Sequence, residues 1–263
     1  MNNIVRGLSI FLLCVSGVSL IALQVKPLGW IVLGMCAISL LFTDRKFARD
    51  VFLIIIALAL LGLTPINTDI STAHIAYMGF TLALAVGIPY CISRFVYKDH
   101  HVRFPWHHGR NWYKSEIAYI GIAGTVAYLL LPFYLKSTGA YLNWPSAIDP
   151  DSLTRLFIGT NGLGLWDELF FVTTVLGILR NYFSFAAANL FQSVLFSSFL
   201  YELGFRSWGF SMIFVFALLQ GYIFKRTESL FYIVTVHLTV DLVLFLALIY
   251  SYHPAFLPIF ITA

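Results

Sequence analysis

Long apolar runs recur along the whole chain, and their length restricts its fold more than any other feature. Nine runs of mostly apolar residues stand at about 5–23, 28–43, 51–66, 73–93, 117–135, 163–179, 183–203, 207–224 and 230–250. A helix needs about 20 such residues to cross the hydrocarbon core of a bilayer. The run at 51–66 is the shortest, so the sequence predicts eight or nine membrane spans.

The composition agrees with a membrane protein and excludes an ordinary soluble domain. Charged residues make up 11% of the chain and apolar residues 60%, with a mean hydropathy of +0.86, whereas a soluble domain carries about 25% charged residues. Backbone groups in lipid must be paired within helices or a closed barrel, and these runs lack the alternation of barrel strands. We therefore expect an all-α, polytopic transmembrane helical bundle, forming a single membrane domain over residues 1–263.

Lysine and arginine are distributed unevenly between the two sides of this bundle. With nine spans, the connections on the side of the N-terminus carry twelve of these residues and the other side carries four. Cytoplasmic loops are enriched in Lys and Arg, so we predict a cytoplasmic N-terminus in a plasma or inner cell membrane. This topology explains the net charge of +4 and gives no reason to expect nucleic acid as a partner.

Two connections are long enough to contain features of their own. Residues 98–116 are basic and aromatic, as expected of a segment lying on anionic headgroups. Their histidines match no standard metal-site spacing, which favours a solvated interfacial loop over a metal site; they are His100, His101, His107 and His108. Residues 136–162 contain Asp149-Pro150-Asp151-Ser152, a helix-start pattern that predicts a short interfacial helix before the sixth span.

Ionisable residues inside the apolar runs are confined to the last four spans. Spans within 1–135 have nearly uncharged apolar cores and are interpreted as scaffold, whereas residues 160–250 form a polar core. The charged members of that core are Asp167, Glu168, Glu202, His237 and Asp241, and the uncharged ones are Asn189, Gln192 and Gln220. A charge at bilayer depth costs about 2.5 kcal/mol or more and by default marks function.

Spacing predicts how the charged residues are arranged. His237 and Asp241 are four apart on one helix, so they share a face and lie side by side. Asp167 and Glu168 are adjacent and point about 100° apart, so we expect that they cannot both face the same spot. Two simpler interpretations stay open: His237 and Asp241 neutralise each other inside the bundle, and the two adjacent carboxylates lie at the outer interface near a helix start.

Depth favours one shared site. Glu168 lies 12 residues before Arg180, and His237 lies 11 residues after Arg226. At about 1.5 Å per residue, both lie some 16–18 Å from the inner surface. Helices running in opposite directions therefore place Glu168 and His237 at similar depth, near the midplane or slightly outside it.

These residues resemble the motifs of the CAAX-protease and bacteriocin-processing (CPBP, or Abi) family of intramembrane proteases. Its members carry a Glu-Glu pair followed by x-x-x-Arg, a Phe-x-x-x-His, and a His-x-x-x-Asn or Asp. Trp166-Asp167-Glu168-Leu169-Phe170-Phe171 resembles the first motif, and His237-Leu238-Thr239-Val240-Asp241 fits the third. The lead-in from Gly221 to Leu230 also resembles the connection in this family. The resemblance covers about a third of the chain.

The chain departs from the first two motifs. Asp167 stands where the first Glu is expected, and Val172 stands where the Arg is expected, with Arg180 as a substitute further along. In the second motif, Leu200 stands at the expected His, and Tyr201 or Glu202 would have to supply the polar group.

The resemblance implies hydrolysis of a peptide bond within or beside the membrane, in a membrane-anchored protein or peptide. A Glu would activate water and a His with an Asn-type partner would stabilise the oxyanion. Here Glu168 or Asp167 would be the base, with His237 and Asp241 as the second half of the site. Asp241 would have to be protonated or to orient His237, because an ionised carboxylate repels an oxyanion. No cofactor is expected; a metal-dependent version with Glu168, His237 and Asp241 as ligands is less favoured, because a second intramembrane His is missing.

Two other functions fit the same residues. An inactive relative would bind a membrane peptide or act in bacteriocin immunity, which the missing Arg and His would explain. A proton-linked transporter would use the carboxylates and His237 as a relay, although the sequence has no inverted repeat or broken helix of the kind expected there. The depth of the site argues against a substrate cut on the cytoplasmic side and for an exported or membrane-anchored peptide.

Overall fold

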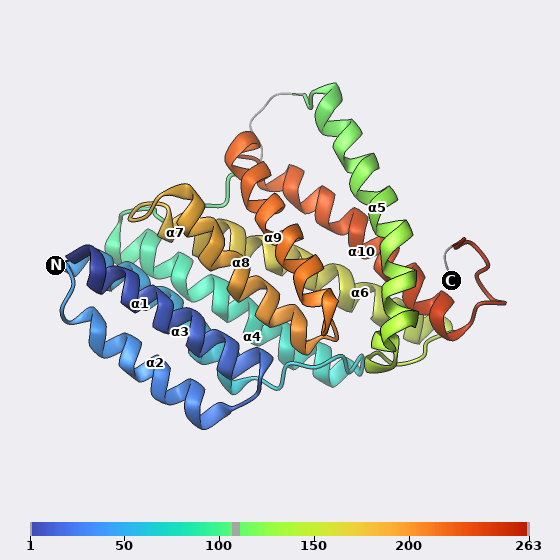
Figure 1. Ribbon diagram of the computed structural model, residues 1–263, viewed down its shortest axis with the longest axis horizontal. Coiled ribbons are helices and arrows are strands. Elements are labelled where there is room, and N and C mark those ends of the chain that lie inside the picture. Colours follow the sequence, from blue (N-terminus) through green and yellow to red (C-terminus); the bar gives the residue numbers. More distant parts are fainter. Residues whose placement is uncertain (1, 107–110, 262–263) are drawn as a thin grey trace.

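A computed structural model describes residues 2–106 and 111–261. These residues form helices joined by short connections, without a strand among them, so the predicted all-α fold is confirmed (Figure 1). The helices are α1 (Asn2–Gly17) with η1 (Val18–Ala22), α2 (Lys26–Leu40), α3 (Arg45–Leu63), α4 (Thr72–Cys91) with η2 (Ile92–Tyr97), α5 (Lys114–Thr138), η3 (Ala140–Asn143), α6 (Pro150–Asp167) with η4 (Glu168–Val175) and α7 (Leu176–Leu179), α8 (Phe185–Glu202), α9 (Trp208–Thr227) and α10 (Leu230–Tyr252).

Six helical stretches of the described chain are long and apolar enough to cross a membrane: Asn3–Ala22, Thr72–Tyr97, Lys114–Thr138, Pro150–Leu179, Trp208–Thr227 and Leu230–Tyr252. Helix α2 is apolar but has only 15 residues, and α3 and α8 complete the nine apolar segments. The structure is therefore a polytopic membrane bundle for which eight or nine spans are plausible.

Polar side chains at the helix starts explain where several helices begin. The carboxylate of Asp44 accepts a hydrogen bond from the Phe47 backbone N–H at 3.0 Å, and Asp149 accepts one from Ser152 at 2.9 Å. Each carboxylate pairs an N–H group that the helix itself leaves unbonded. The helix start at Pro150 was predicted correctly. The prediction of a separate short interfacial helix before the sixth span was wrong. The helix that starts at Pro150 continues to Leu179, because no residue in between interrupts it.

Contacts between connections divide the bundle into two ends. One, here called the basic end, contains the N-terminus and residues 41–44, 98–106, 180–184 and 228–229. Two hydrogen bonds connect these segments: Arg6 Nε donates to Asp44 Oδ2 at 3.0 Å, and Leu230 N donates to Pro105 O at 2.8 Å. The other, here called the far end, contains residues 64–71, 139–149 and 203–207. There the Tyr134 hydroxyl donates to Gly204 O at 2.9 Å.

The helices pack so that α10 and α6 lie at the centre of the C-terminal half. Helix α10 packs against α5 and α6, α8 packs against α9, and α1 and α2 pack against each other (Figure 1). The Trp166 indole N–H on α6 donates to Leu82 O on α4 at 2.8 Å, which ties the C-terminal half to the N-terminal helices.

Candidate functional site

His237 of α10 is the centre of a buried cluster built from three helical segments. Its Nδ1 lies 2.7 Å from Oε1 of Glu168, the first residue of η4. The amide Nε2 of Gln220 on α9 donates to the same oxygen at 2.6 Å. All three side chains are buried. A hydrogen bond between Nδ1 and Glu168 orients the imidazole and couples its tautomer to the state of that carboxyl group.

The opposite nitrogen of the same imidazole faces two aspartates. Nε2 of His237 lies 4.0 Å from Asp167 Oδ2 and 3.7 Å from Asp241 Oδ1. Both separations exceed a direct hydrogen bond, and a water that contacts Nε2 and either carboxylate would lie beside the pair rather than between its members. Asp241 therefore lies beside His237, as the four-residue spacing predicted.

Asp167 and Glu168 face different spots, as predicted, yet both contact the same imidazole. The two carboxylates approach opposite nitrogens of one ring, Glu168 at Nδ1 and Asp167 at Nε2. Two features explain this outcome. The imidazole occupies the space between the two side-chain directions, and the π-helical turn that begins at Glu168 departs from regular α-helical geometry.

Close packing fixes the ring and one of its partners. Phe196 stacks on His237 with ring centroids 5.9 Å apart, and Phe216 meets the ring edge-on at 5.0 Å. Gly164 on α6 faces Asp241 so closely that a Cβ at this position would overlap the Asp241 carboxylate. A side chain larger than hydrogen at 164 would therefore displace Asp241.

Four polar atoms of this cluster are buried without a hydrogen-bond partner in the described structure: Asp167 Oδ1, Glu168 Oε2, Gln220 Oε1 and Asp241 Oδ2. Such atoms cost about 1–3 kcal/mol each when they stay unpaired. Most buried polar atoms in folded proteins have a partner. The three carboxylates therefore keep bonding capacity that no described residue uses, and buried water is the usual partner of such atoms.

A cavity of about 610 Å³ reaches this cluster. Asp167, His237 and Asp241 line it, whereas Glu168 is not among its lining residues. The rest of the wall is largely apolar and comes from α5, α6, α9 and α10. The cavity therefore presents two carboxylates and one imidazole to a mainly apolar space.

The other predicted site residues are not seen to contact His237. Glu202 and Tyr201 end α8 beside the far-end loop, where Glu202 Oε2 lies 3.4 Å from Arg206 Nη2. Arg180 is exposed just after α7, at the basic end. Of the motif departures, Val172 is buried, and Leu200 lines the cavity without a polar group.

Gln220 is a member of the cluster that sequence reasoning did not place in the site. It was noted only as one of three uncharged polar residues in the last spans. The available signal was an amide in an apolar run, but Asn189 and Gln192 carry the same signal. Those two bond to each other and to backbone carbonyls of α9 instead, with Gln192 Nε2 donating to Asn189 Oδ1 at 2.9 Å.

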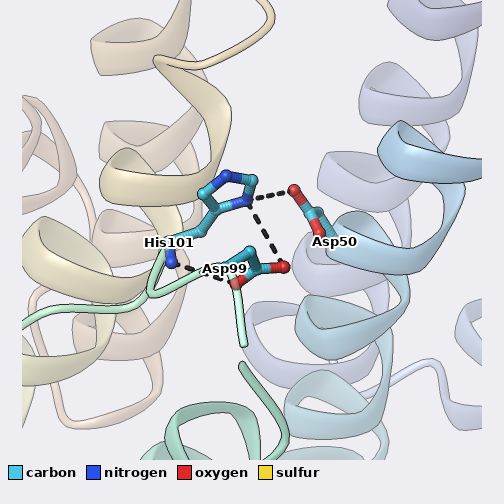
Figure 2. Close-up of side chains that lie close together, drawn as sticks. All are labelled: Asp50, Asp99 and His101. Atoms are coloured by element: carbon cyan, nitrogen blue, oxygen red, sulfur yellow. Dashed lines mark hydrogen bonds and ion pairs between the residues drawn. The ribbon is translucent and has the colours of Figure 1, made fainter. Parts of the chain in front are cut away.

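A second histidine cluster lies at the basic end, outside the cavity (Figure 2). His101 Nδ1 lies 2.5 Å from Asp50 Oδ2 and 3.8 Å from Asp99 Oδ2. Arg49 Nη2 donates to Asp99 at 2.7 Å, and Tyr182 OH donates to Asp50 at 2.5 Å. The candidate ligand atoms of these two aspartates and His101 lie within 4.8 Å of one another, but Arg49 already supplies positive charge there.

Ionisation in this second cluster follows its hydrogen bonds. Partial burial disfavours the charged form of Asp99. The hydrogen bonds from Ser93 and the His101 backbone, with the nearby His101 and Arg49, outweigh it and lower the pKa of Asp99. The four histidines of the predicted interfacial loop differ in their surroundings. His100 Nδ1 lies 2.7 Å from Arg94 Nη1, and His101 is held by Asp50. His107 and His108 lie outside the described residues.

Comparison with known proteins finds one family. Residues 150–243 match the model described as Rce1-like, type II CAAX prenyl endopeptidase Rce1-like. No curated protein and no solved structure matches the chain. The matched segment extends from the start of α6 into α10 and contains the Asp167-Glu168 pair, Gln220, His237 and Asp241. The predicted resemblance to the CPBP and CAAX-protease family is therefore confirmed over residues 150–243, about a third of the chain.

Proposed function

We propose that this protein is an intramembrane endopeptidase that hydrolyses a peptide bond of a membrane-anchored protein or peptide. The observation that carries the proposal is the group of Asp167, His237 and Asp241 at the wall of an apolar cavity, with His237 Nε2 facing both aspartates at 4.0 and 3.7 Å. The match over residues 150–243 supports a membrane protease in general. The bilayer and the membrane-anchored substrate are the proposed partners, and the mechanism requires no cofactor.

The attacking water would lie beside His237 Nε2, Asp167 and Asp241. The distances of 4.0 and 3.7 Å from Nε2 to the two carboxylates are too long for direct hydrogen bonds, so the water would sit on the cavity side and contact these groups from there. Asp167 is favoured over Glu168 as the base, because Asp167 lines the cavity and Glu168 lies behind the imidazole, bound to Nδ1. Glu168, held by Gln220, would then orient His237 and balance its charge.

Proton transfers complete the reaction. Two carboxylates facing one imidazole in an apolar site share a proton more readily than both ionise. The ionised Asp167 takes a proton from water as its oxygen attacks the carbonyl carbon. The protonated Asp241 and the Nε2–H of a protonated His237 donate to the oxyanion. When the C–N bond breaks, the proton held by Asp167 passes to the leaving amine.

The test compares wild-type protein with Asp167→Asn, Glu168→Gln and His237→Ala in native membranes. Small membrane-anchored proteins are profiled by mass spectrometry for changed termini, with expression of each variant checked. We expect one precursor to accumulate in all three variants.

Normal termini in all three variants would reject catalysis. In that case the buried Leu200 and Val172 at two motif positions would instead fit an inactive binding or immunity protein. A proton-linked transporter would be identified by substrate-driven pH changes in vesicles.

A further inference from the structure

The cavity lies nearer to the far end of the bundle than to the basic end. Its lining on α9 extends from Trp208, the first residue of the helix, to Leu219. Trp144, Leu203 and Phe205, from far-end connections, also line it. No described residue of the basic-end connections is among its lining residues. The cavity therefore extends from the histidine cluster to the far end.

At the basic end, the connection before α5 covers the start of α10 and closes this side of the cluster. The backbone N–H groups of Leu230 and Phe231 donate to Pro105 O at 2.8 Å and Trp106 O at 3.0 Å. Trp112 packs against Tyr232 with ring centroids 5.4 Å apart. The His101 clamp on Asp50 holds the same segment against α3. Access to His237 from this end would require these contacts to break.

The cavity also reaches the side of the bundle. Ile122 and Val126 of α5, and Val215 and Leu219 of α9, line it and are between 43% and 58% exposed. Both helices contact α10, which carries His237. In a membrane such apolar residues face lipid, so the cavity is open to the bilayer between α5 and α9.

The chemistry of the wall defines what fits. Among residues 2–106 and 111–261, no Lys or Arg lines the cavity, and the carboxylates that do are Asp167 and Asp241, both in the cluster. Away from the cluster, Thr160, Ser211, Tyr119 and two tryptophans are the polar groups among apolar side chains. A charged side chain there would stay unpaired in a dry site, so the occupant is uncharged and apolar over the length of the cavity.

We propose that the cavity binds an uncharged, apolar segment of a membrane-anchored polypeptide, which enters sideways between α5 and α9 and reaches the cluster from the far end. This assignment rests on the proposed endopeptidase function. With the predicted cytoplasmic basic end, the substrate is cut from the non-cytoplasmic half of the membrane. The occupant is a polypeptide, because the cavity leads to Asp167, His237 and Asp241, the groups to which the proposed function assigns peptide-bond hydrolysis.

Cysteine labelling tests the direction of access without any known substrate. The background variant is Cys91→Ser, because Cys91 is exposed and the other two cysteines are buried. Ser211→Cys and Ala123→Cys place small thiols in the cavity wall. Ser146→Cys marks the far end and Lys98→Cys marks the basic end, and both positions are exposed.

A membrane-impermeant maleimide is applied to sealed vesicles of each orientation. We expect the cysteines at 211 and 123 to react from the same side as the cysteine at 146. Reaction only from the side of the cysteine at 98 would overturn the proposal. Because the two marker positions define the sides, the result does not depend on which end is cytoplasmic.

Protection from labelling tests the occupant. A synthetic transmembrane peptide of leucine and alanine should slow labelling of the cysteine at 123 by a membrane-permeable maleimide at least fivefold. The same peptide with aspartate at its centre should give no protection. Protection by added fatty acid but not by peptide would show a lipid site and reject the polypeptide.

Neither readout requires activity. Normal labelling together with normal termini in the His237→Ala variant would reject the proposed function alone.

Discussion

Residues 2–106 and 111–261 contain two histidine–carboxylate clusters, a half-buried one at the basic end and a buried one at the cavity, and they differ in how many hydrogen-bond donors surround the carboxylates. At the basic end, Asp99 is bonded by Arg49, Ser93 and the His101 backbone, and Asp50 is bonded by His101 and Tyr182. At the cavity, Asp167 and Asp241 have a histidine at 3.7–4.0 Å and one unpartnered oxygen each. Asp50 also keeps one oxygen without a hydrogen bond, but Arg49 Nε lies 3.6 Å from it. The same residue types thus form one clamp with an arginine beside its carboxylates and one site in which a histidine faces them across a longer gap.

The difference shows that burial of a charged group does not by itself indicate catalysis. A cluster whose donors and charges are balanced contributes to stability and resists a new ligand. A cluster with unpaired carboxylate oxygens beside a cavity lowers the stability of the fold but can take part in a reaction.

Loss of a cavity carboxylate should have the largest effect. Asp167→Asn should lower the rate of precursor processing about 1,000-fold, because general base catalysis contributes about 10²–10⁴-fold. Processing per folded molecule is measured by mass spectrometry of termini. Asp50→Asn should change this rate less than threefold, and an equal loss in both variants would remove the distinction between the clusters.

Stability should show the reverse order. Asp50→Asn should lower the free energy of unfolding by about 3 kcal/mol, since it breaks a buried ion pair. Tyr182→Phe should cost about 1 kcal/mol, the net value of one hydrogen bond. Thermal unfolding in detergent measures both changes. Asp167→Asn should be neutral or stabilising in the same assay, and a loss comparable to that of Asp50→Asn would contradict the comparison.

A methyl group at position 164 should disturb the cavity cluster alone. Gly164→Ala should slow processing 10- to 100-fold, because its Cβ would displace the Asp241 carboxylate. Such overpacking also costs about 1–3 kcal/mol. Gly159→Ala is the matched control on the same helix, since a Cβ there meets nothing within 4 Å, and it should leave processing unchanged.

Removal of the Gln220 amide should have a smaller effect. Gln220→Leu should lower processing about tenfold, because Glu168 would lose one of the two donors that orient it while His237 keeps its position. The matched control is Gln192→Leu, which affects the α8–α9 contact and leaves processing per folded molecule intact. Equal processing in wild type and Gln220→Leu would show that Gln220 only fills space.

The contribution of the basic-end clamp to stability should decrease only below about pH 4. The folded-state pKa of Asp99 is lowered, so its contribution to stability is fully present above its unfolded pKa of about 3.9 and is lost as pH falls through the folded value. The melting temperature should therefore show no loss from this group between pH 7 and 5, and a loss below about pH 4. Asp99→Asn should reduce the loss below pH 4, and an unchanged acid profile would argue against this role.

The sequence predicted the helical bundle well because apolar length and end-capping residues act locally. The runs correspond to helices, and Asp149 and Pro150 marked a helix start correctly. The continuation through Leu179 was missed, because the polar residues between 150 and 162 do not break a helix. The similar depth of Glu168 and His237 was also predictable, since it depends only on residue counts from basic residues.

The details of the site depended on long-range contacts that no local pattern encodes. Asp167 and Glu168 reach the same imidazole because α10 places a ring between them. Gln220 joins the site, whereas Gln192 does not, according to the helix faces that pack together. Asp50 was not singled out, because it lies at the edge of an apolar run and is buried by a loop 50 residues further on.

The hydrogen bond from Trp166 to Leu82 has a consequence for engineering. The segment that matches the family model lies within 150–243, yet Trp166 next to the site finds its acceptor on a helix outside that segment. An excised fragment of residues 150–263 would leave this indole N–H without its partner in lipid and would expose the face of α8 that packs on α1. The matched segment is thus not a portable module, and chimeras with related proteins should exchange it together with α1 and α4.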